Sequence, residues 1–285
     1  MIGPAMVVRR VSQPRPWALR LSMGLLTFLA AISIGAPLIT SADPTFESAA
    51  GLTALGEPLD AGAEGHPLGT DPKGRDLLAR ILYAGRVTLF TALGAVAIAT
   101  LAGLVIGLLA ASSRSFVGSV LMRVTDLGLA IPGLLLAAAI TTILGRGVTS
   151  LIVGLAAVFW APIARVTYGQ AVVLREREYV EAAKVQGAGP AYLLLRHILP
   201  HLLPVVAAYA ALSVGWAVLF ESALGFLGAG VQEPDASIGS LLGCCLVYYR
   251  SHPGLILFPA IFLAVLVASA NLAGESLRPR TEGGR

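Results

Sequence analysis

The sequence has little charge for its length. Charged residues make up 13% of the 285 residues and hydrophobic residues 56%, with a mean hydropathy of +0.81. A soluble domain contains roughly 25% charged residues, so this composition excludes an ordinary soluble protein and predicts a membrane protein. The net charge of +4 is small and the basic residues are dispersed. Nucleic-acid binding, which needs basic residues gathered on one face, is therefore not indicated.

Cysteine and lysine are also scarce. The two cysteines, Cys244 and Cys245, are adjacent, which excludes a disulfide framework and a C-x-x-C metal site, and we interpret both as small buried hydrophobic residues. The two lysines, Lys73 and Lys184, follow Pro72 and Ala183. Since a Walker A loop needs a lysine directly after glycine, the chain does not hydrolyse ATP through a P-loop of its own.

Residues for other catalytic chemistry are also lacking. His197 and His201 have the i,i+4 spacing that could place a metal on one helix face, but there is no H-E-x-x-H pattern and Pro200 is expected to interrupt the helix between them. We interpret them as histidines at the membrane interface. No G-x-S-x-G nucleophile elbow is present. We predict no catalytic residue, no metal site and no enzymatic activity for this chain.

Long apolar runs are abundant instead. A helix needs roughly 18–20 residues to cross a bilayer, and in lipid the backbone must pair internally. We therefore predict an all-α polytopic membrane protein with a transmembrane domain over 21–275. A cleaved signal peptide is the alternative for the first run, but a signal core usually has only about 7–15 residues. The six expected spans are 21–40, 87–111, 124–144, 148–164, 202–220 and 254–272.

The distribution of arginine and lysine predicts the orientation. With the N-terminus in the cytosol, fourteen basic residues lie inside and six outside, in agreement with the positive-inside rule. Both termini are then cytosolic. The segments outside the spans are a cytosolic N-terminal segment 1–20, an outer loop 41–86, a cytosolic loop 165–201, an outer loop 221–253 that could dip back toward the membrane, and a cytosolic tail 276–285.

Acidic residues lie near the expected span ends. Asp126 has Arg123 three residues earlier, which favours a structural salt bridge at the interface. Glu221 and Glu275 stand at the outer end of the fifth span and just past the sixth. A proton-driven carrier would be expected to hold acids near span centres, so a stand-alone secondary transporter or channel is the less favoured alternative.

Small residues are frequent inside the spans. Gly103 and Gly107 form a G-x-x-x-G pattern, which allows helices to approach closely in lipid. The pattern agrees with a packed bundle and with pairing to a second membrane subunit.

The polar segment 178–200, "EYVEAAKVQGAGPAYLLLRHILP", separates two strongly apolar runs. Its first part contains helix-forming residues and the charge pairs Arg177–Glu181 and Glu181–Lys184. Gly187 and Gly189 then break the chain, and Pro190 suits the first turn of a second helix. This pattern predicts two short helices joined by a glycine hinge at the cytosolic surface.

Five stretches together resemble the permeases of ABC importers. "EAA" at 181–183, with Gly187 and then Leu199-Pro200, resembles the EAA loop of that family, although His197 stands where the pattern has isoleucine. "HPLGTDPKGRDLLARILYAGRVTL", "LMRVTDLGLAIPGLLLA", "ESALGFLGAGVQEPDASIGSLL" and the closing "NLAGESLR" resemble the dipeptide, oligopeptide and nickel branch, with Ile238 where tryptophan is common. The chain is similar to the second permease subunit of that branch.

The resemblance implies a fold like that of a type I ABC importer permease, with cytosolic EAA coupling helices that dock on the ATPase. It implies as partners a homologous permease, two ABC ATPases, an extracytoplasmic substrate-binding protein and the lipid bilayer of the bacterial inner membrane. ATP and Mg²⁺ would bind the ATPases, so we expect no cofactor in this chain. Peptides, nickel chelates and haem-like ligands all stay open as substrates. The coupling residues implied are Glu178, Tyr179, Glu181, Ala182, Ala183, Gly187, Leu199 and Pro200.

Overall fold

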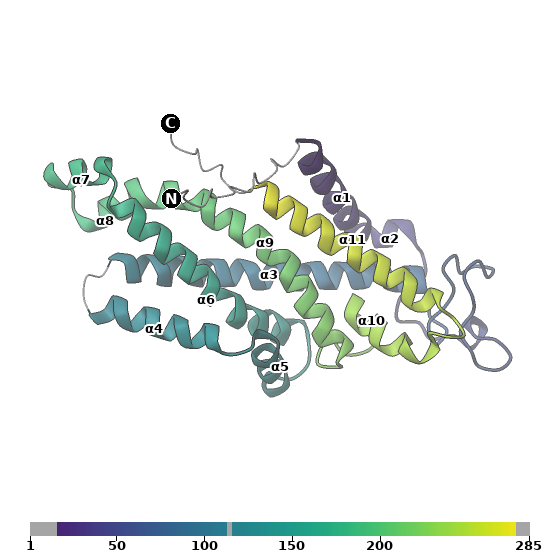
Figure 1. The fold of residues 1–285 in the computed structure, drawn as a ribbon. Helices are drawn as coiled ribbons and strands as arrows, with labels where there is room; N and C mark the ends of the chain where they lie inside the picture. The colour runs from purple at the N-terminus through teal and green to yellow at the C-terminus, as the bar shows by residue number, and fades with distance from the viewer. Residues whose placement is uncertain (1–15, 113–115, 278–285) are drawn as a thin grey trace, which may run out of the picture.

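The computed structural model describes residues 16–112 and 116–277, with side chains from residue 20 onward. These residues form a long helical bundle with α7 at one end and the loop 40–76 at the other (Figure 1), which we call the α7 end and the loop end. The described residues contain no β-strand, and three isolated bridges stiffen the loop. The helices are α1 (Pro16–Ile34), α2 (Ala36–Ile39), α3 (Leu77–Ser112), α4 (Phe116–Ala130), α5 (Gly133–Leu144), α6 (Val148–Arg175), α7 (Glu178–Val185), α8 (Pro190–Tyr192), the π-helix Leu193–Ile198, α9 (Leu199–Phe226), α10 (Ile238–Cys245) and α11 (Gly254–Ser276).

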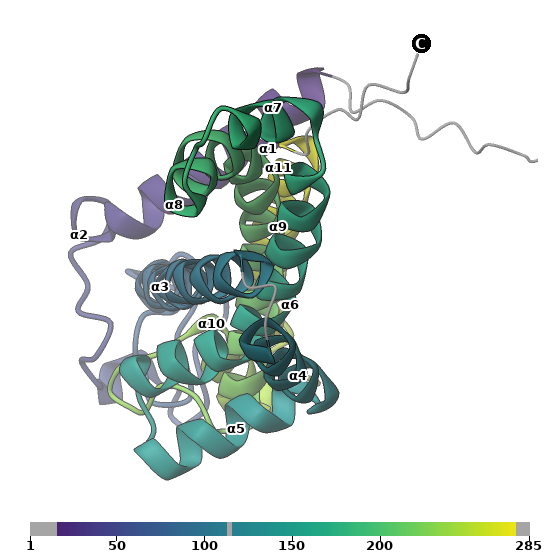
Figure 2. The same cartoon turned by 90° about the vertical axis from the view of Figure 1, so that its left-hand side faces the viewer.

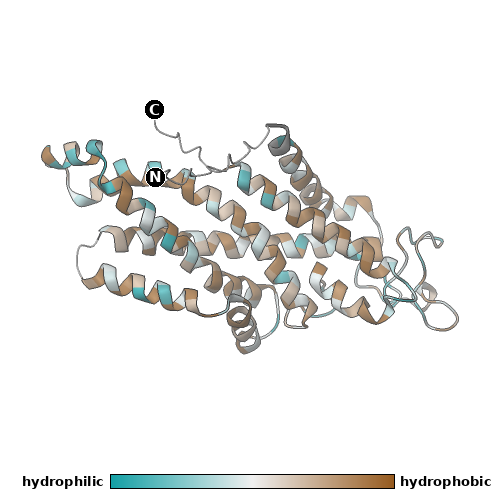
Figure 3. Cartoon of the chain, viewed as in Figure 1, coloured by the Kyte–Doolittle hydropathy of each residue, from teal (hydrophilic) through white to brown (hydrophobic). Residues whose placement is uncertain are grey.

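The predicted all-α membrane fold is confirmed in its main features. In the described part of the chain, four helical segments are long and apolar enough to cross a membrane: α3, α6, Pro190–Phe226 and α11. The pair α4 and α5 makes a fifth if it counts as one span. Hydrophobic residues dominate the long helices, and hydrophilic residues gather at α7 (Figure 3). The count of six spans stays a prediction, since the described part of α1 is a shorter apolar helix.

The first expected span, 21–40, is divided. α1 ends at Ile34, and α2 begins after Gly35. Pro37 in the first turn of α2 has no N–H for the carbonyl of Ser33, which favours a break between α1 and α2.

The third expected span, 124–144, is wrong as a single helix. α4 and α5 meet at a break with a bend of 90°, and α5 lies across the direction of the neighbouring helices (Figure 2). Pro132 at the start of α5 disfavours a helical conformation of Ile131 and lacks the N–H of a continuous helix. The break leaves a pocket between α4, α6 and α9, lined by Ile131, Trp216 and Phe220 among others.

Several helices extend beyond the expected spans. α3 starts ten residues before position 87, at Leu77, and α6 continues through Pro162 to Arg175. The outer loop 41–86 and the loop 165–201 are correspondingly shorter. The second outer loop, 221–253, contains the end of α9 and the whole of α10, whose Ile238, Leu241 and Cys245 are buried against the bundle.

α3 packs closely along α6. A Cβ at Gly103 would lie 2.8 Å from the Cβ of Ile163, and one at Gly107 would lie 2.7 Å from the Ala164 carbonyl oxygen. The G-x-x-x-G pattern therefore serves the packing of α3 on α6 within this chain. Of the two cysteines, Cys245 is buried as predicted, but Cys244 is exposed.

Candidate coupling site

The candidate site is the segment 176–200 at the α7 end, which contains all the sequence-predicted coupling residues. α7 begins with Glu178 and Glu181 in its first turn and ends with Lys184 in its last. This order of charges suits the helix dipole, which favours acids at the N-terminus and bases at the C-terminus. Neither of the expected pairs Arg177–Glu181 and Glu181–Lys184 lies within 4 Å among the ion pairs of the described residues.

α7 is held to the bundle by one face. Val180 is fully buried. The ring of Tyr179 lies 5.4 Å from the ring of His201 and 6.3 Å from that of His197. These contacts join α7 to the π-helix and to the first turn of α9.

The turn after α7 depends on Gly187. Its φ is +87°, the left-handed region that favours glycine. The Gly187 N–H donates to the carbonyl of Lys184 at 2.9 Å, and the Ala188 N–H donates to that of Ala183 at 3.0 Å. This is the Schellman arrangement that closes a helix at a glycine, so the predicted glycine hinge is a fixed turn.

The second half of the segment differs from the prediction. Pro190 starts α8 as expected, but α8, the π-helix and α9 continue as one helical rod from Pro190 to Phe226. Pro200 lies in the first turn of α9 and does not interrupt it. The Leu199 N–H donates to the carbonyl of Leu194, five residues back, and the wider π-turn accommodates the missing N–H of the proline.

The predicted coupling residues form a mostly exposed surface. Val185, which sequence reasoning did not select, adds the most exposed apolar side chain of α7, at 89%. Exposed apolar and acidic side chains on one short helix suit contact with another protein. The exposed members of the predicted set are Glu178, Tyr179, Glu181, Ala182, Gly187 and Pro200, and the half-buried ones are Ala183 and Leu199.

The prediction that Asp126 forms a salt bridge with Arg123 is wrong. Asp126 on α4 pairs with Arg165 on α6, while Arg123 is exposed. An acid three residues after a base is the less favourable order on a helix, and the pair with Arg165 shows that Asp126 faces α6 instead. The pair ties α4 to α6 on the side of the pocket near Gly128.

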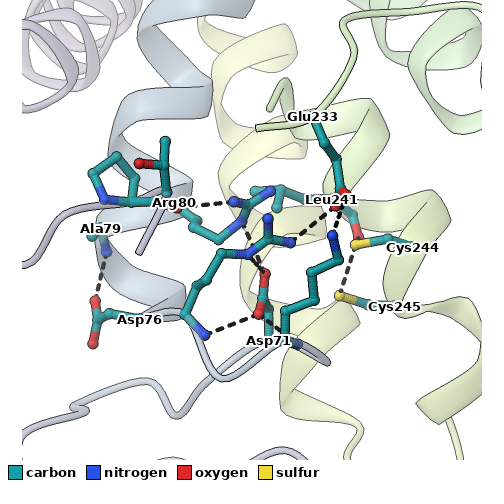
Figure 4. Close-up of polar contacts among 12 residues, drawn as sticks. Asp71, Asp76, Ala79, Arg80, Glu233, Leu241, Cys244 and Cys245 are labelled. Atoms are coloured by element: carbon teal, nitrogen blue, oxygen red, sulfur yellow. Dashed lines mark hydrogen bonds and ion pairs between the residues drawn. The ribbon is translucent and has the colours of Figure 1, made fainter. Parts of the chain in front are cut away.

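A second polar cluster at the loop end was not predicted (Figure 4). Asp71 is fully buried and accepts from Nε of Arg75 at 2.6 Å, and its Oδ2 lies 3.1 Å from Nε of Arg80. Arg75 also donates to Glu233 at 3.1 Å, and Lys73 pairs with Glu233 as well. The cluster links the loop 40–76, the start of α3 and the segment 227–237.

Lys73 and Glu233 in this cluster each stabilise the charged form of the other. The Lys73 ammonium, hydrogen-bonded to Glu233, holds the pKa of that carboxyl below its ordinary value against the opposing effect of burial. Glu233, and then Glu47, raise the pKa of Lys73 in turn. The charged pattern "TDPKGRDLLAR" was the available signal in the sequence, but Glu233 lies too far along the chain for local spacing to find it.

Comparisons with known proteins identify the family of the chain. A family described as "Binding-protein-dependent transport system inner membrane component" matches residues 103–283. The chain belongs to this family. The resemblance predicted from the motifs is confirmed at that level, and the chain is a membrane component of a transport system.

Relatives of this inner membrane component carry peptide transport names. A putative peptide transport system permease protein of Brucella suis biovar 1 is 36% identical, covering 97% of this chain and 92% of its own. The di/tripeptide transport system permease protein DppC of Pseudomonas aeruginosa is 34% identical over 90% and 85%. The solved MetNI methionine ABC transporter in inward-facing conformations shares the fold, with a TM-score of 0.58, 19% identity and coverage of 70% of this chain and 94% of that one.

Glu221, which we expected at the outer end of the fifth span, lies inside the bundle. Glu221 is fully buried, and its Oε2 accepts from the Thr88 hydroxyl at 3.0 Å. The same hydroxyl oxygen accepts from the backbone N–H of Ile238 at 3.2 Å. Through the Thr88 hydroxyl, the carboxyl group of Glu221 links α9 and α3 to the first residue of α10.

Proposed function

We propose that the chain is the second permease subunit of an ATP-driven ABC importer for di- or oligopeptides, and that α7 is the helix through which the ATPases move it. The observation that carries the proposal is the exposed surface of α7, fixed by buried Val180 to a rod that continues through the bundle. The chain lacks a P-loop lysine, so the energy has to come from partner chains. The peptide substrate follows from the names of the relatives.

In this proposal the chain forms half of the translocation path beside a homologous permease. Two ABC ATPases bind ATP and Mg²⁺ below α7, and an extracytoplasmic substrate-binding protein delivers the peptide at the loop end. Both termini are then cytosolic, in the bacterial inner membrane. The pocket at the α4–α5 break, with Trp216 and Phe220 in its wall, is the candidate lining of the path, because aromatic and apolar side chains accept varied peptide side chains.

Site-specific crosslinking tests the docking of α7. Val185→Cys, on the exposed face of α7, is expected to crosslink to the co-expressed ATPase, whereas Leu55→Cys is not. Leu55 is a matched control because it is 86% exposed, close to the 89% of Val185, and lies at the opposite end. Crosslinking of Leu55→Cys alone, or failure of the ATPase to co-purify, would instead favour a carrier or channel that works by itself.

Substitutions in the turn test coupling. Gly187→Pro cannot adopt φ +87° because proline fixes φ near about −65°. We expect it to abolish peptide uptake while membrane insertion stays normal, and bulky substitutions of Ala182 or Ala183 to do the same by blocking close approach. Ala188→Ser, next to the hinge, is the control. Normal uptake by Gly187→Pro at normal expression would contradict the coupling role.

A further inference from the structure

A pocket lies between the coupling segment and the ends of α3 and α6. Arg175 from α6 and Lys184 from α7 line it together with the apolar side chains of Val180, Leu193 and Ile198. The pocket therefore presents positive charge on one side and a hydrophobic wall on the other. None of the predicted coupling residues is among those that line it.

The two cations of this pocket have no acidic partner. Among the ion pairs of the described residues, none includes Arg175 or Lys184. Arg175 Nη1 donates to the carbonyl of Ala111, and Lys184 Nζ donates to the carbonyl of Arg175 at 3.3 Å. Backbone carbonyls satisfy a donor but do not neutralise a charge, so the pocket can accept an anion.

An exposed apolar stripe leads from the bundle to the same pocket. Ile98, Leu101 and Val105 lie on one face of α3 and are 50–66% exposed. Ser112, seven residues after Val105 and on the same face, lines the pocket. α3 ends at Ser112, so the pocket lies beyond the apolar stripe at the end of this helix, beside the charged coupling segment.

We propose that this pocket binds the phosphate headgroup of an anionic phospholipid, whose acyl chain follows the stripe on α3. Basic pockets between membrane helices are a recognised site for such headgroups. The apolar stripe favours a lipid over a soluble anion, because a free phosphate has no acyl chain to pack against it. A lipid held there would contact α3, α6 and α7 at once and would set the resting position of the coupling segment. The proposal requires only that the chain spans a bilayer, so it does not depend on the ATPase or on the substrate.

Native mass spectrometry of the full chain, purified in mild detergent, tests the proposal. Phosphatidylglycerol and phosphatidylcholine with identical acyl chains are added in turn. We expect the wild type to retain phosphatidylglycerol in preference to phosphatidylcholine, and Lys184→Gln to weaken this binding about fivefold, the effect of one cation near a headgroup. Lys184→Arg is expected to restore it. Arg196→Gln, which removes an exposed cation of the same segment outside the pocket, should bind as the wild type does.

Three results would overturn the proposal. Equal retention of the two lipids would show that the pocket does not distinguish an anionic headgroup from a zwitterionic one. A loss in Arg196→Gln as large as in Lys184→Gln would show a diffuse surface effect. Displacement of phosphatidylglycerol by inorganic phosphate would show a site for a free anion. Because lipid binding is measured without transport, none of these results depends on the function proposed above.

Discussion

Replacing Asp71 by alanine is expected to destabilise the loop end by about 3–5 kcal/mol, the range for breaking a buried ion pair from one side. Asp71 faces two guanidinium groups, at 2.6 Å and 3.1 Å, and the side chains of Arg75 and Arg80 are 1% and 3% exposed. After the substitution Arg75 keeps Glu233, but Arg80 keeps the carbonyl of Pro44, which carries no full charge. Most of the destabilisation is therefore expected to come from the buried charge of Arg80, which is left without a counter-charge.

Thermal unfolding can be followed through Cys245, which is buried and becomes reactive toward a thiol dye on unfolding. Cys244→Ser removes the exposed thiol beside it. Glu233→Gln is the comparison: its side chain is 50% exposed, so its loss should cost at most about 1 kcal/mol. Asp71→Leu combined with Arg80→Met should recover part of the loss, since no cation is then left unpaired. If Asp71→Ala melts no earlier than Glu233→Gln, the cations do not depend on Asp71 and the reasoning fails.

Two further predictions concern helix packing and pH. Gly107→Val should lower the free energy of unfolding by about 1–3 kcal/mol because its Cβ would meet Thr167 at 2.6 Å and the Ala164 carbonyl. Gly169→Val, with nothing within 4 Å of its Cβ, is the control in the same unfolding assay, and equal effects would refute close packing. Because the pKa of Glu233 is lowered, its contribution is present above the ordinary value of 4.5 and is lost as pH falls through the folded pKa. When unfolding is measured at decreasing pH, the free energy of unfolding should fall by less than about 1 kcal/mol on account of Glu233. This decrease should be absent in Glu233→Gln.

Local sequence features predicted the helices but not their breaks. Pro132 and Pro162 both lie in apolar runs, yet only Pro132 ends a helix. Gly103 of α3 packs against Trp160 and Ile163, on both sides of Pro162, and such packing holds a helix together across a proline. At the other proline, the preceding residue Ile131 is 47% exposed, so less packing supports the backbone there. This difference arises from tertiary contacts and is not visible in either run.

The candidate site was predictable where its geometry is local. Gly187 and Pro190 define the turn by their own backbone preferences, and the structure places both as the pattern indicates. The partner of Asp126 and the cluster around Asp71 depend on Arg165 and Glu233, which reach their places only when distant helices pack. The predicted break at Pro200 was wrong because the π-helix before it shifts the backbone hydrogen bonds by one residue. Residue spacing in the sequence gives no sign of such a shift.

The unbroken rod from Pro190 to Phe226 has a mechanical consequence. Its 37 residues extend about 55 Å, so a tilt of about 5° about one end displaces the other by about 5 Å. A rigid rod that rocks about its middle moves its two ends in opposite directions. Tyr192 lies near one end and Glu221 near the other, on opposite sides of such a pivot. If the proposed translocation path runs beside this helix, a swing that widens the bundle near Tyr192 narrows it near Glu221, so the path opens at one end at a time.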